Sequence, residues 1–161
     1  GTSDQVFEDV LRDFWGWSLN DFKRSLRQQM LARRVVSKLD TSAHTKANAA
    51  MAELKAGVAF ADVAKKYSAD TNTASNGGEY TITIDKSNRD INARVTSALF
   101  ALKPGEYSSI IDTGYTLEIV ILNSFEGSKA HASHIQINLE DISSILNPLK
   151  DKQKASKYIK V

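Results

Sequence analysis

The sequence of 161 residues contains no cysteine. A chain without thiols forms no disulfide, binds no zinc through thiolates and has no cysteine nucleophile, so three classes of chemistry are excluded. No run approaches the ~20 apolar residues of a membrane-spanning helix, and the N-terminus lacks the basic-then-apolar layout of a signal peptide. We expect no membrane contact by this chain. The sequence does not exclude a membrane anchor or signal upstream, because Gly1-Thr2-Ser3 resembles the remnant of a cleaved tag.

An excess of charge of one sign is also missing. Lysine and arginine number 21 against 19 aspartates and glutamates, a net charge of +2, so no large excess exists to release counterions from nucleic acid. We therefore expect no nucleic-acid partner. The main charge cluster lies on one face of a predicted helix, and either a solvated face or a contact with RNA or a membrane surface would explain it. Its members are Lys23, Arg24, Arg27, Arg33, Arg34 and Lys38.

A length of 161 residues with 42% hydrophobic side chains suits one soluble domain with a helical appendage. The first forty residues are predicted to be helical. Apolar residues recur at helical spacing up to Gly16, and Ser18 with Asp21 forms a capping-box pattern for a second helix that ends near Leu39. The residues expected to face inward on the second helix are Phe22, Leu26, Met30 and Val36.

The rest of the chain shows both helical and strand patterns. Apolar spacing predicts helices from Thr41 or Ser42 to Lys55, over 60–67 and around 95–102. Alternating residues predict strands over 80–84, 107–112, 117–122 and 130–138. The tail from Leu139 again has helical spacing, with Pro148 breaking or restarting the helix.

Three segments carry motifs in a fixed order: 56–70 (AGVAFADVAKKYSAD), 77–80 (GGEY) and 98–108 (ALFALKPGEYS). Together they resemble the parvulin family of peptidyl-prolyl cis/trans isomerases, which are PpiC-type rotamases. The N-terminal helices, with 16–22 (GWSLNDF), further resemble the chaperone arm that precedes the parvulin domain in SurA- and PrsA-type exported foldases.

The sequence departs from this family at the first strand. That strand normally carries a histidine in an Ala-Ser-His-Ile-Leu type motif before the first helix, and too few residues separate Leu39 from Thr41 to form it. The pattern stands instead at 132–137 (ASHIQI), near the far end of the chain. In the family fold the first strand lies antiparallel beside the last one. A hairpin through 125–128 would therefore bring 132–137 into the vacant position.

We accordingly predict an α+β fold, a parvulin-like four-stranded antiparallel sheet with surrounding helices, whose first strand comes from the C-terminal side by circular permutation. The predicted domains are a helical arm at 1–40, the permuted isomerase domain at 41–138 and a helical segment at 139–161 that packs on the arm. In the alternative, a second, tandem domain begins at Ala130, but the residues that follow are too few to complete it.

The resemblance implies a prolyl isomerase that needs no cofactor. Rotation about an X-Pro bond faces a barrier near ~20 kcal/mol, and catalysis requires an apolar pocket for the proline ring with polar groups that favour the twisted amide. Matched to the family's motif, the catalytic residues are His134, Asp70, Thr113 and Glu118, and Glu118 replaces a second histidine. The substrate-binding residues are Tyr80, Ile91, Val95 and Phe100, with Val95 in place of a larger phenylalanine.

Each of these residues also has a structural interpretation. His134 would fit a hydrogen-bonded structural histidine, Asp70 a cap at a helix end, and Glu118 an exposed strand residue. Gly77-Gly78 predicts a turn and not a phosphate-binding loop. We expect no metal site, because His131 and His134 point to different faces and no third ligand is evident.

We therefore expect a peptidyl-prolyl isomerase and foldase that acts on the X-Pro bonds of unfolded or exported, proline-containing polypeptides. The alternative is a parvulin-like chaperone or peptide-binding module with weak or no turnover, which Glu118 and Val95 favour. A nucleic-acid role for the basic helix ranks third. The resemblance of the arm implies an extracytoplasmic location, and we expect a monomer.

Overall fold

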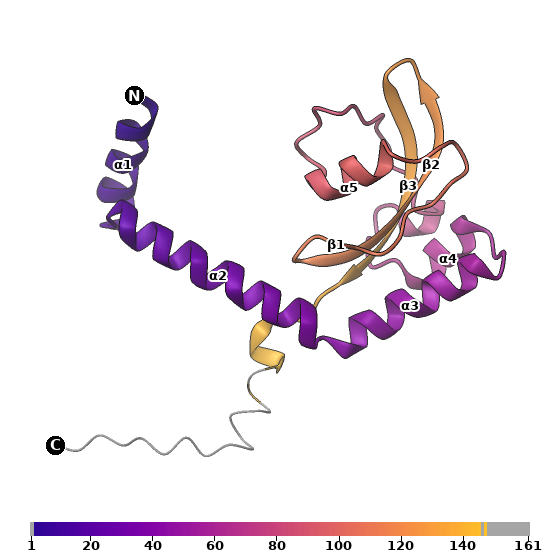
Figure 1. Ribbon diagram of the computed structural model, residues 1–161, viewed down its shortest axis with the longest axis horizontal. Helices are drawn as coiled ribbons and strands as arrows, with labels where there is room; N and C mark the ends of the chain where they lie inside the picture. The colour runs from indigo at the N-terminus through magenta and orange to yellow at the C-terminus, as the bar shows by residue number, and fades with distance from the viewer. Residues whose placement is uncertain (1, 146, 148–161) are drawn as a thin grey trace.

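The computed structural model describes residues 2–145 and 147, so most of the predicted C-terminal helical segment, 148–161, lies outside the described residues. The described chain is a mixed α/β arrangement of helices around a three-stranded antiparallel sheet (Figure 1). No helix in this part of the chain combines the length and apolar character needed to cross a lipid bilayer. The helices are α1 (Thr2–Trp15), α2 (Leu19–Leu39), α3 (Thr41–Lys55), α4 (Phe60–Tyr67) and α5 (Ala93–Leu99), with a 3-10 turn at Ala74–Asn76 and a helical turn at 142–145.

Helices α1 and α2 lie in the range that was predicted to be helical. The capping box at the start of α2 is present, because the Asp21 N–H donates to Ser18 Oγ (3.2 Å) and the Ser18 N–H donates back to Asp21 Oδ2 (3.1 Å). Contrary to prediction, Leu26 and Met30 are 41% and 55% exposed. The reason is that α2 projects away from the sheet, so only its C-terminal end, at the buried Val36, reaches the rest of the fold (Figure 1).

The junction between α2 and α3 is organised by a buried aspartate. Helix α3 begins at Thr41, one of the two predicted starts, and Asp40 caps it, because its Oδ1 accepts the Ala43 N–H at 2.8 Å. Its other oxygen, Oδ2, accepts the N–H of Glu140 at 2.7 Å. One carboxylate therefore fixes the start of α3 and also ties down the segment that follows the last strand.

The sheet consists of β1 (Ile111–Asp112), β2 (Thr116–Glu126) and β3 (Lys129–Asn138), paired antiparallel in that order. The predicted hairpin is present, since β2 and β3 pair along their length and turn at 127–128. Strand β1 is shorter than the predicted 107–112. Tyr107 makes only an isolated bridge to β2, and the hydroxyl of Ser108 accepts the Val120 N–H at 3.1 Å, so a side chain takes a place in the ladder.

The predicted strand at 80–84 does not form a regular fourth strand. Its two ends reach the free edge of β3, where Tyr80 N–H donates to the carbonyl of Ala132 (3.0 Å) and Ile84 N–H to that of Ala130 (2.9 Å). A bend at 81–82 separates these two contacts and interrupts the ladder. The described sheet therefore has three strands, with the 79–84 segment attached to its β3 edge by isolated bridges.

The sheet separates two buried apolar clusters, which follow the alternation of side chains along its strands. Helices α3 and α4 cover one face, and α5 with the 79–84 segment covers the other. The first cluster contains Ala43, Ala47, Ala50, Leu54, Val63, Ala64, Leu117, Ile119, Ile135 and Ile137. The second contains Ile84, Val95, Leu99, Val120, Leu122, Ala130 and Ala132.

Candidate active site

The ASHIQI segment places a histidine on the face of the sheet that α5 covers. His134 lies in β3 directly opposite Val120 and is only 4% exposed. Glu118 lies two residues before Val120 in β2, so both side chains project from the same face as diagonal neighbours. The distance from His134 Nδ1 to Glu118 Oε2 is 3.5 Å.

A second carboxylate approaches the opposite nitrogen of the same ring. Asp70 follows α4, and its Oδ2 lies 2.9 Å from His134 Nε2. The hydroxyl of Thr73 contacts both groups, 2.7 Å from Asp70 Oδ2 and 3.0 Å from His134 Nε2. Each ring nitrogen of this buried histidine therefore has a carboxylate partner.

The loop that carries Asp70 runs along the edge of β3. Ala69 N–H donates to the Gln136 carbonyl at 2.6 Å, and Gln136 N–H donates to Ser68 Oγ at 3.1 Å. Further along, His134 N–H donates to the Gly78 carbonyl at 2.8 Å. These three hydrogen bonds on both sides of Thr73 hold the loop against the strand and fix the distance between Asp70 and His134.

Tyr80 covers the outer side of the histidine. The two rings are stacked with centroids 4.3 Å apart and an angle of 28° between their planes. Burial, together with repulsion from Glu118 and Asp70, raises the pKa of Tyr80 far above its usual range. The phenol therefore stays neutral, and its ring shields the imidazole from solvent.

The two carboxylates decide the charge of the histidine. Burial by itself lowers the pKa of His134, but the hydrogen bonds and attraction from Glu118 and Asp70 outweigh it, so the net pKa is raised. For Asp70, burial raises the pKa, whereas hydrogen bonds from Thr73 and His134 lower it by more, so the net pKa is lowered. Both effects favour an imidazolium beside an ionised carboxylate.

The hydrogen-bond directions agree with a protonated Nε2. Thr73 has one hydroxyl proton, and Asp70 is an acceptor, so the hydroxyl donates to Asp70. The oxygen of Thr73 can then only accept from His134, which requires a proton on Nε2. The arrangement is a buried, oriented network that keeps a proton on His134 Nε2 and produces a fixed electrostatic field at the surface of the sheet.

Of the other predicted site residues, Thr113 is linked to this network by hydrogen bonds, whereas Ile91 and Val95 belong to the apolar cluster under α5. Thr113 occupies the β1–β2 turn, and its hydroxyl lies 2.8 Å from that of Thr116, which donates to Glu118 Oε1 at 2.8 Å. Ile91 is half-buried against the cluster under α5, while Val95 lies within that cluster and is 1% exposed.

Phe100 is the predicted residue that the structure places elsewhere. It packs beside Phe125, with ring centroids 5.9 Å apart, and both line a cavity of about 680 Å³ with Asp85 and Lys129. This cavity adjoins the tip of the β2–β3 hairpin, whereas His134 lies nearer the middle of β3. The structure therefore brings Tyr80, Asp70, Glu118 and His134 together and leaves Phe100 outside the group.

Sequence reasoning missed Thr73, which is buried and contacts both Asp70 and His134. The available signal was its position three residues after Asp70, a spacing at which a hydroxyl and a carboxylate meet in a turn. The interpretation of Glu118 as an exposed strand residue is wrong, because it is only 8% exposed. Asp70 does serve as a local cap, since its Oδ1 accepts the Asn72 N–H at 3.1 Å. Among residues 2–145 and 147, no group of three or more His, Cys, Asp or Glu side chains is arranged to hold a metal ion.

Comparison with known proteins gives three findings. A family model described as rotamase, PPIC-type PPIase domain, matches residues 30–124, more than half of the chain. A curated relative, foldase protein PrsA of Lacticaseibacillus paracasei, is 28% identical over 140 residues, covering 70% of this chain and 46% of the relative. The chain therefore spans less than half the length of that relative. A crystal structure of foldase protein PrsA from Streptococcus pneumoniae str. Canada MDR_19A aligns with 24% identity and a TM-score of 0.35, covering 94% of this chain and 62% of that one.

Proposed function

Because the chain belongs to the PPIC-type (parvulin) rotamase family, we propose that it catalyses cis/trans isomerisation of X-Pro bonds in unfolded polypeptides. The observation that carries this proposal is the buried network in which His134 joins Asp70, Thr73 and Glu118. No cofactor is required, because the reaction only rotates a bond that already exists. The proposal therefore covers both the substrate, an unfolded polypeptide, and the catalytic turnover.

The proposed mechanism is stabilisation of the twisted amide. A planar X-Pro amide must lose its resonance to rotate, and this loss sets a barrier near ~20 kcal/mol. An oriented charge network lowers such a barrier only if it favours the twisted form over both planar forms. Because His134 is buried, we assign it a positioning role: it fixes Asp70 and the stacked Tyr80, the more accessible groups at the sheet surface.

We also propose that the domain is a circular permutant of the family fold. The supporting observation is that 132–137 lies between β2 and the 79–84 segment, antiparallel to β2, as the resemblance requires of the first strand. In addition, the family match ends at residue 124, before this segment. A variant with 129–138 transferred to a position before Thr41 should fold and keep its activity. Loss of the folded state in that variant would count against the proposal.

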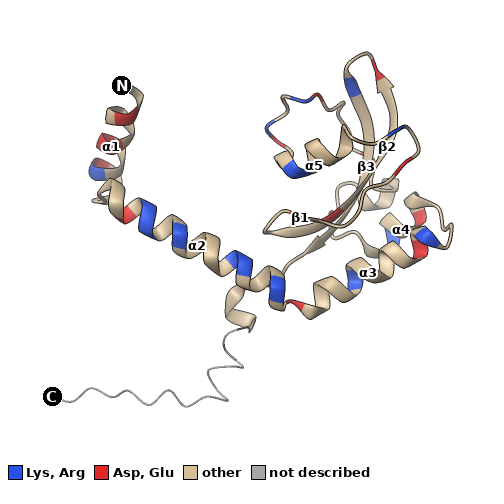
Figure 2. Ribbon diagram, viewed as in Figure 1, with Lys and Arg blue, Asp and Glu red and all other residues tan. Residues whose placement is uncertain are grey.

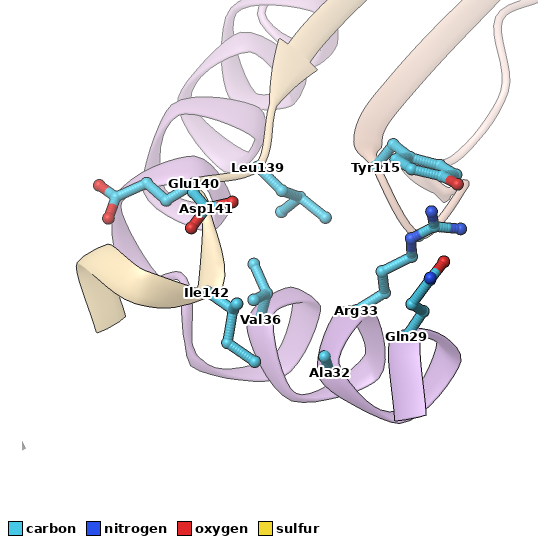
Figure 3. Close-up of a pocket in the computed structure, with 10 residues that line it drawn as sticks. Gln29, Ala32, Arg33, Val36, Tyr115, Leu139, Glu140, Asp141 and Ile142 are labelled. Carbon is cyan, nitrogen blue, oxygen red and sulfur yellow. The ribbon is translucent and has the colours of Figure 1, made fainter. Parts of the chain in front are cut away.

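The proposed domain limits are the arm at 1–40, the isomerase domain at 41–138 and the C-terminal segment at 139–161. The described part of the last segment supports this division at one point, where Leu139 and Ile142 line a cavity of about 350 Å³ together with Val36 and Ala32 of α2 (Figure 3). Residues 41–138 should therefore resist limited proteolysis as one unit, and an early cut within 41–138 would contradict these limits.

A second candidate function is chaperone-type binding of unfolded chains without turnover. The observation that favours it is the apolar surface of the arm, where Phe14, Trp15 and Leu31 are 80%, 61% and 64% exposed. Exposed aromatic and aliphatic side chains of this size are typical of surfaces that bind other chains. The two candidates are compatible in one protein, but only the first predicts faster bond rotation.

Proline-limited refolding separates the two candidates. An isomerase accelerates the slow refolding phase of an unfolded protein in proportion to its own concentration, whereas a holding chaperone leaves that phase unchanged or slows it. We expect acceleration by the parent chain and its loss in His134→Gln. The matched control is His131→Gln in the same strand, whose Nε2 lies 3.2 Å from Glu126 Oε2. No acceleration by the parent chain would contradict the isomerase proposal, and equal loss in both variants would contradict the role given to the His134 network.

We further propose a monomer that acts outside the cytoplasm. The location is supported by the resemblance of the arm to the arm of exported foldases. The same resemblance supports unfolded polypeptides as the substrates. Cell fractionation with an antibody against the chain tests the location, and recovery in the cytoplasmic fraction alone would contradict it. Sedimentation of the purified chain tests the oligomeric state.

A further inference from the structure

A second cleft lies on the arm side of the sheet, between α2, the β1–β2 turn and α5. Its volume is about 510 Å³. Figure 2 shows lysine and arginine in blue along α2 and at the start of α5. The charged residues that line the cleft are Arg33, Arg34, Lys38, Arg94 and Asp112, and we call this cavity the basic cleft.

The basic cleft concentrates positive charge. Four cations and one carboxylate line it, which is more positive charge than the net +2 of the whole chain. Among residues 2–145 and 147, none of the four cations forms an ion pair with a carboxylate. Like charges held together without counter-charges repel one another, so a bound anion would relieve that repulsion.

The one carboxylate in the basic cleft is already occupied by other donors. Asp112 Oδ2 accepts the hydroxyl of Ser37, and its Oδ1 accepts the Gly114 N–H at 2.7 Å. Arg94 donates instead to the main-chain carbonyl of Asp112, at 2.7 Å. The guanidinium of Arg94 is therefore held in the cleft by a main-chain carbonyl and not by an ion pair with Asp112.

Arg33 is positioned by an aromatic ring. Its guanidinium carbon lies 3.7 Å from the centroid of the Tyr115 ring, and Figure 3 shows the two groups stacked. This contact leaves the N–H groups at the edge of the guanidinium available as donors. Glu140 and Asp141 line the neighbouring 350 Å³ cavity, and Figure 3 shows them across that cavity from Arg33.

The basic cleft adjoins the candidate active site through the β1–β2 turn. Thr113 lines the cleft, and its hydroxyl contacts that of Thr116, which in turn donates to Glu118. The two places differ in charge, because Glu118 and Asp70 surround His134 with carboxylates. An acidic side chain would therefore be attracted to the basic cleft and repelled from the His134 site.

We propose that the basic cleft binds carboxylate-rich segments of polypeptide substrates while an X-Pro bond elsewhere in the same chain occupies the His134 site. This substrate class rests on the isomerase function proposed above. A volume of about 510 Å³ accommodates a few side chains, and a concave site flanked by Met30 and Tyr115 suits an extended peptide better than a flat bilayer. Binding at two places in one chain raises the effective concentration of the X-Pro bond.

Fluorescence anisotropy tests the proposal without using turnover. The probes are two labelled, proline-free peptides that differ only in carrying Glu or Gln at alternate positions. We expect the Glu peptide to bind the full chain, with affinity falling between ~50 mM and ~200 mM salt, and the Gln peptide to bind at least about tenfold more weakly. The variant Arg33→Gln/Arg34→Gln/Lys38→Gln should weaken Glu-peptide binding roughly tenfold, since exposed ion pairs contribute modestly and three are removed.

The matched control is Lys46→Gln/Lys55→Gln/Lys103→Gln, which removes the same charge from exposed positions outside the cleft. Equal weakening in the two triple variants, or equal binding of the two peptides, would overturn the proposal. So would tighter, cleft-dependent binding of poly-U RNA or of phosphatidylglycerol vesicles than of the Glu peptide. Because the probes lack proline, a chain that binds them but does not accelerate isomerisation would refute only the proposed function.

Discussion

The packing of Gly78 against β3 gives a prediction whose size follows from the structure. A Cβ atom at Gly78 would lie 2.1 Å from the carbonyl oxygen of His134, and the residue has φ +81°. The matched control is Gly105, which has φ +85° but nothing within 4 Å of the same position. Alanine at either residue therefore carries the cost of a left-handed backbone, and only Gly78→Ala adds a collision.

The left-handed backbone costs ~1–2 kcal/mol for either alanine. Relieving the collision requires the loop to move away from β3, which breaks the bonds from His134 N–H to Gly78 and from Tyr80 N–H to Ala132. Each such bond contributes about 0.5–1.5 kcal/mol. We therefore expect Gly78→Ala to lower the unfolding free energy by about 1–3 kcal/mol more than Gly105→Ala does.

Urea unfolding of the two variants measures this difference, and thermal unfolding should show it as a Tm gap of roughly 2–12 °C. The reasoning depends on 77–80 pressing on the strand that carries His134. If the two variants lose the same stability, the loop does not contact β3 at that point. The placement of 132–137 beside this loop, and with it the proposed permutation, would then be refuted.

Three other changes test the buried network and the α2–α3 junction. Thr73→Val removes the hydroxyl that contacts both Asp70 and His134, and we expect kcat/KM for an Ala-Pro peptide to fall at least about tenfold; an unchanged value would contradict the role of this network. The raised pKa of His134 contributes stability that is complete below its unfolded value of 6.5 and is lost as pH rises through the folded pKa. The lowered pKa of Asp70 contributes stability that is present above 3.8 and is lost as pH falls through its folded pKa. Urea unfolding between about pH 5 and pH 9 should therefore show that Glu118→Gln loses less unfolding free energy than the parent as the pH rises. If the two plots of unfolding free energy against pH superimpose, Glu118 does not act on the histidine. Asp40→Ala leaves two main-chain N–H groups without their acceptor, so the unfolding free energy should fall by ~2–4 kcal/mol, and a loss within error would refute the assigned double contact.

Much of the fold could be predicted because it depends on local signals. Helical spacing and caps predicted α2 to α4 to within a residue or two, and the alternation in 130–138 predicted β3. The prediction of a strand at 80–84 was wrong, and the local alternation of residues could not have shown why. Its alternation is regular, but a bend at 81–82 leaves only its two ends hydrogen-bonded to β3.

The site was predicted less completely, because burial depends on contacts that are distant in sequence. The motif gave His134 and Asp70, which the structure brings within hydrogen-bond distance across 64 residues of chain. The spacing of Thr73 from Asp70 predicts a local turn contact but not the contact with His134, which depends on the loop lying against β3. Nor could it show that the predicted inward face of α2 stays exposed at Leu26 and Met30, since this depends on where the arm points.

Exchange NMR on an Ala-Pro peptide tests most directly the claim that the His134 network catalyses bond rotation. Without a catalyst, cis and trans forms interconvert over ~10–100 s at 25 °C. We predict that the chain at substoichiometric concentration speeds this exchange, and that Asp70→Asn and Thr73→Val abolish most of the effect while His131→Gln keeps it. Exchange that stays at the uncatalysed rate even with equal amounts of folded protein and peptide would contradict the claim.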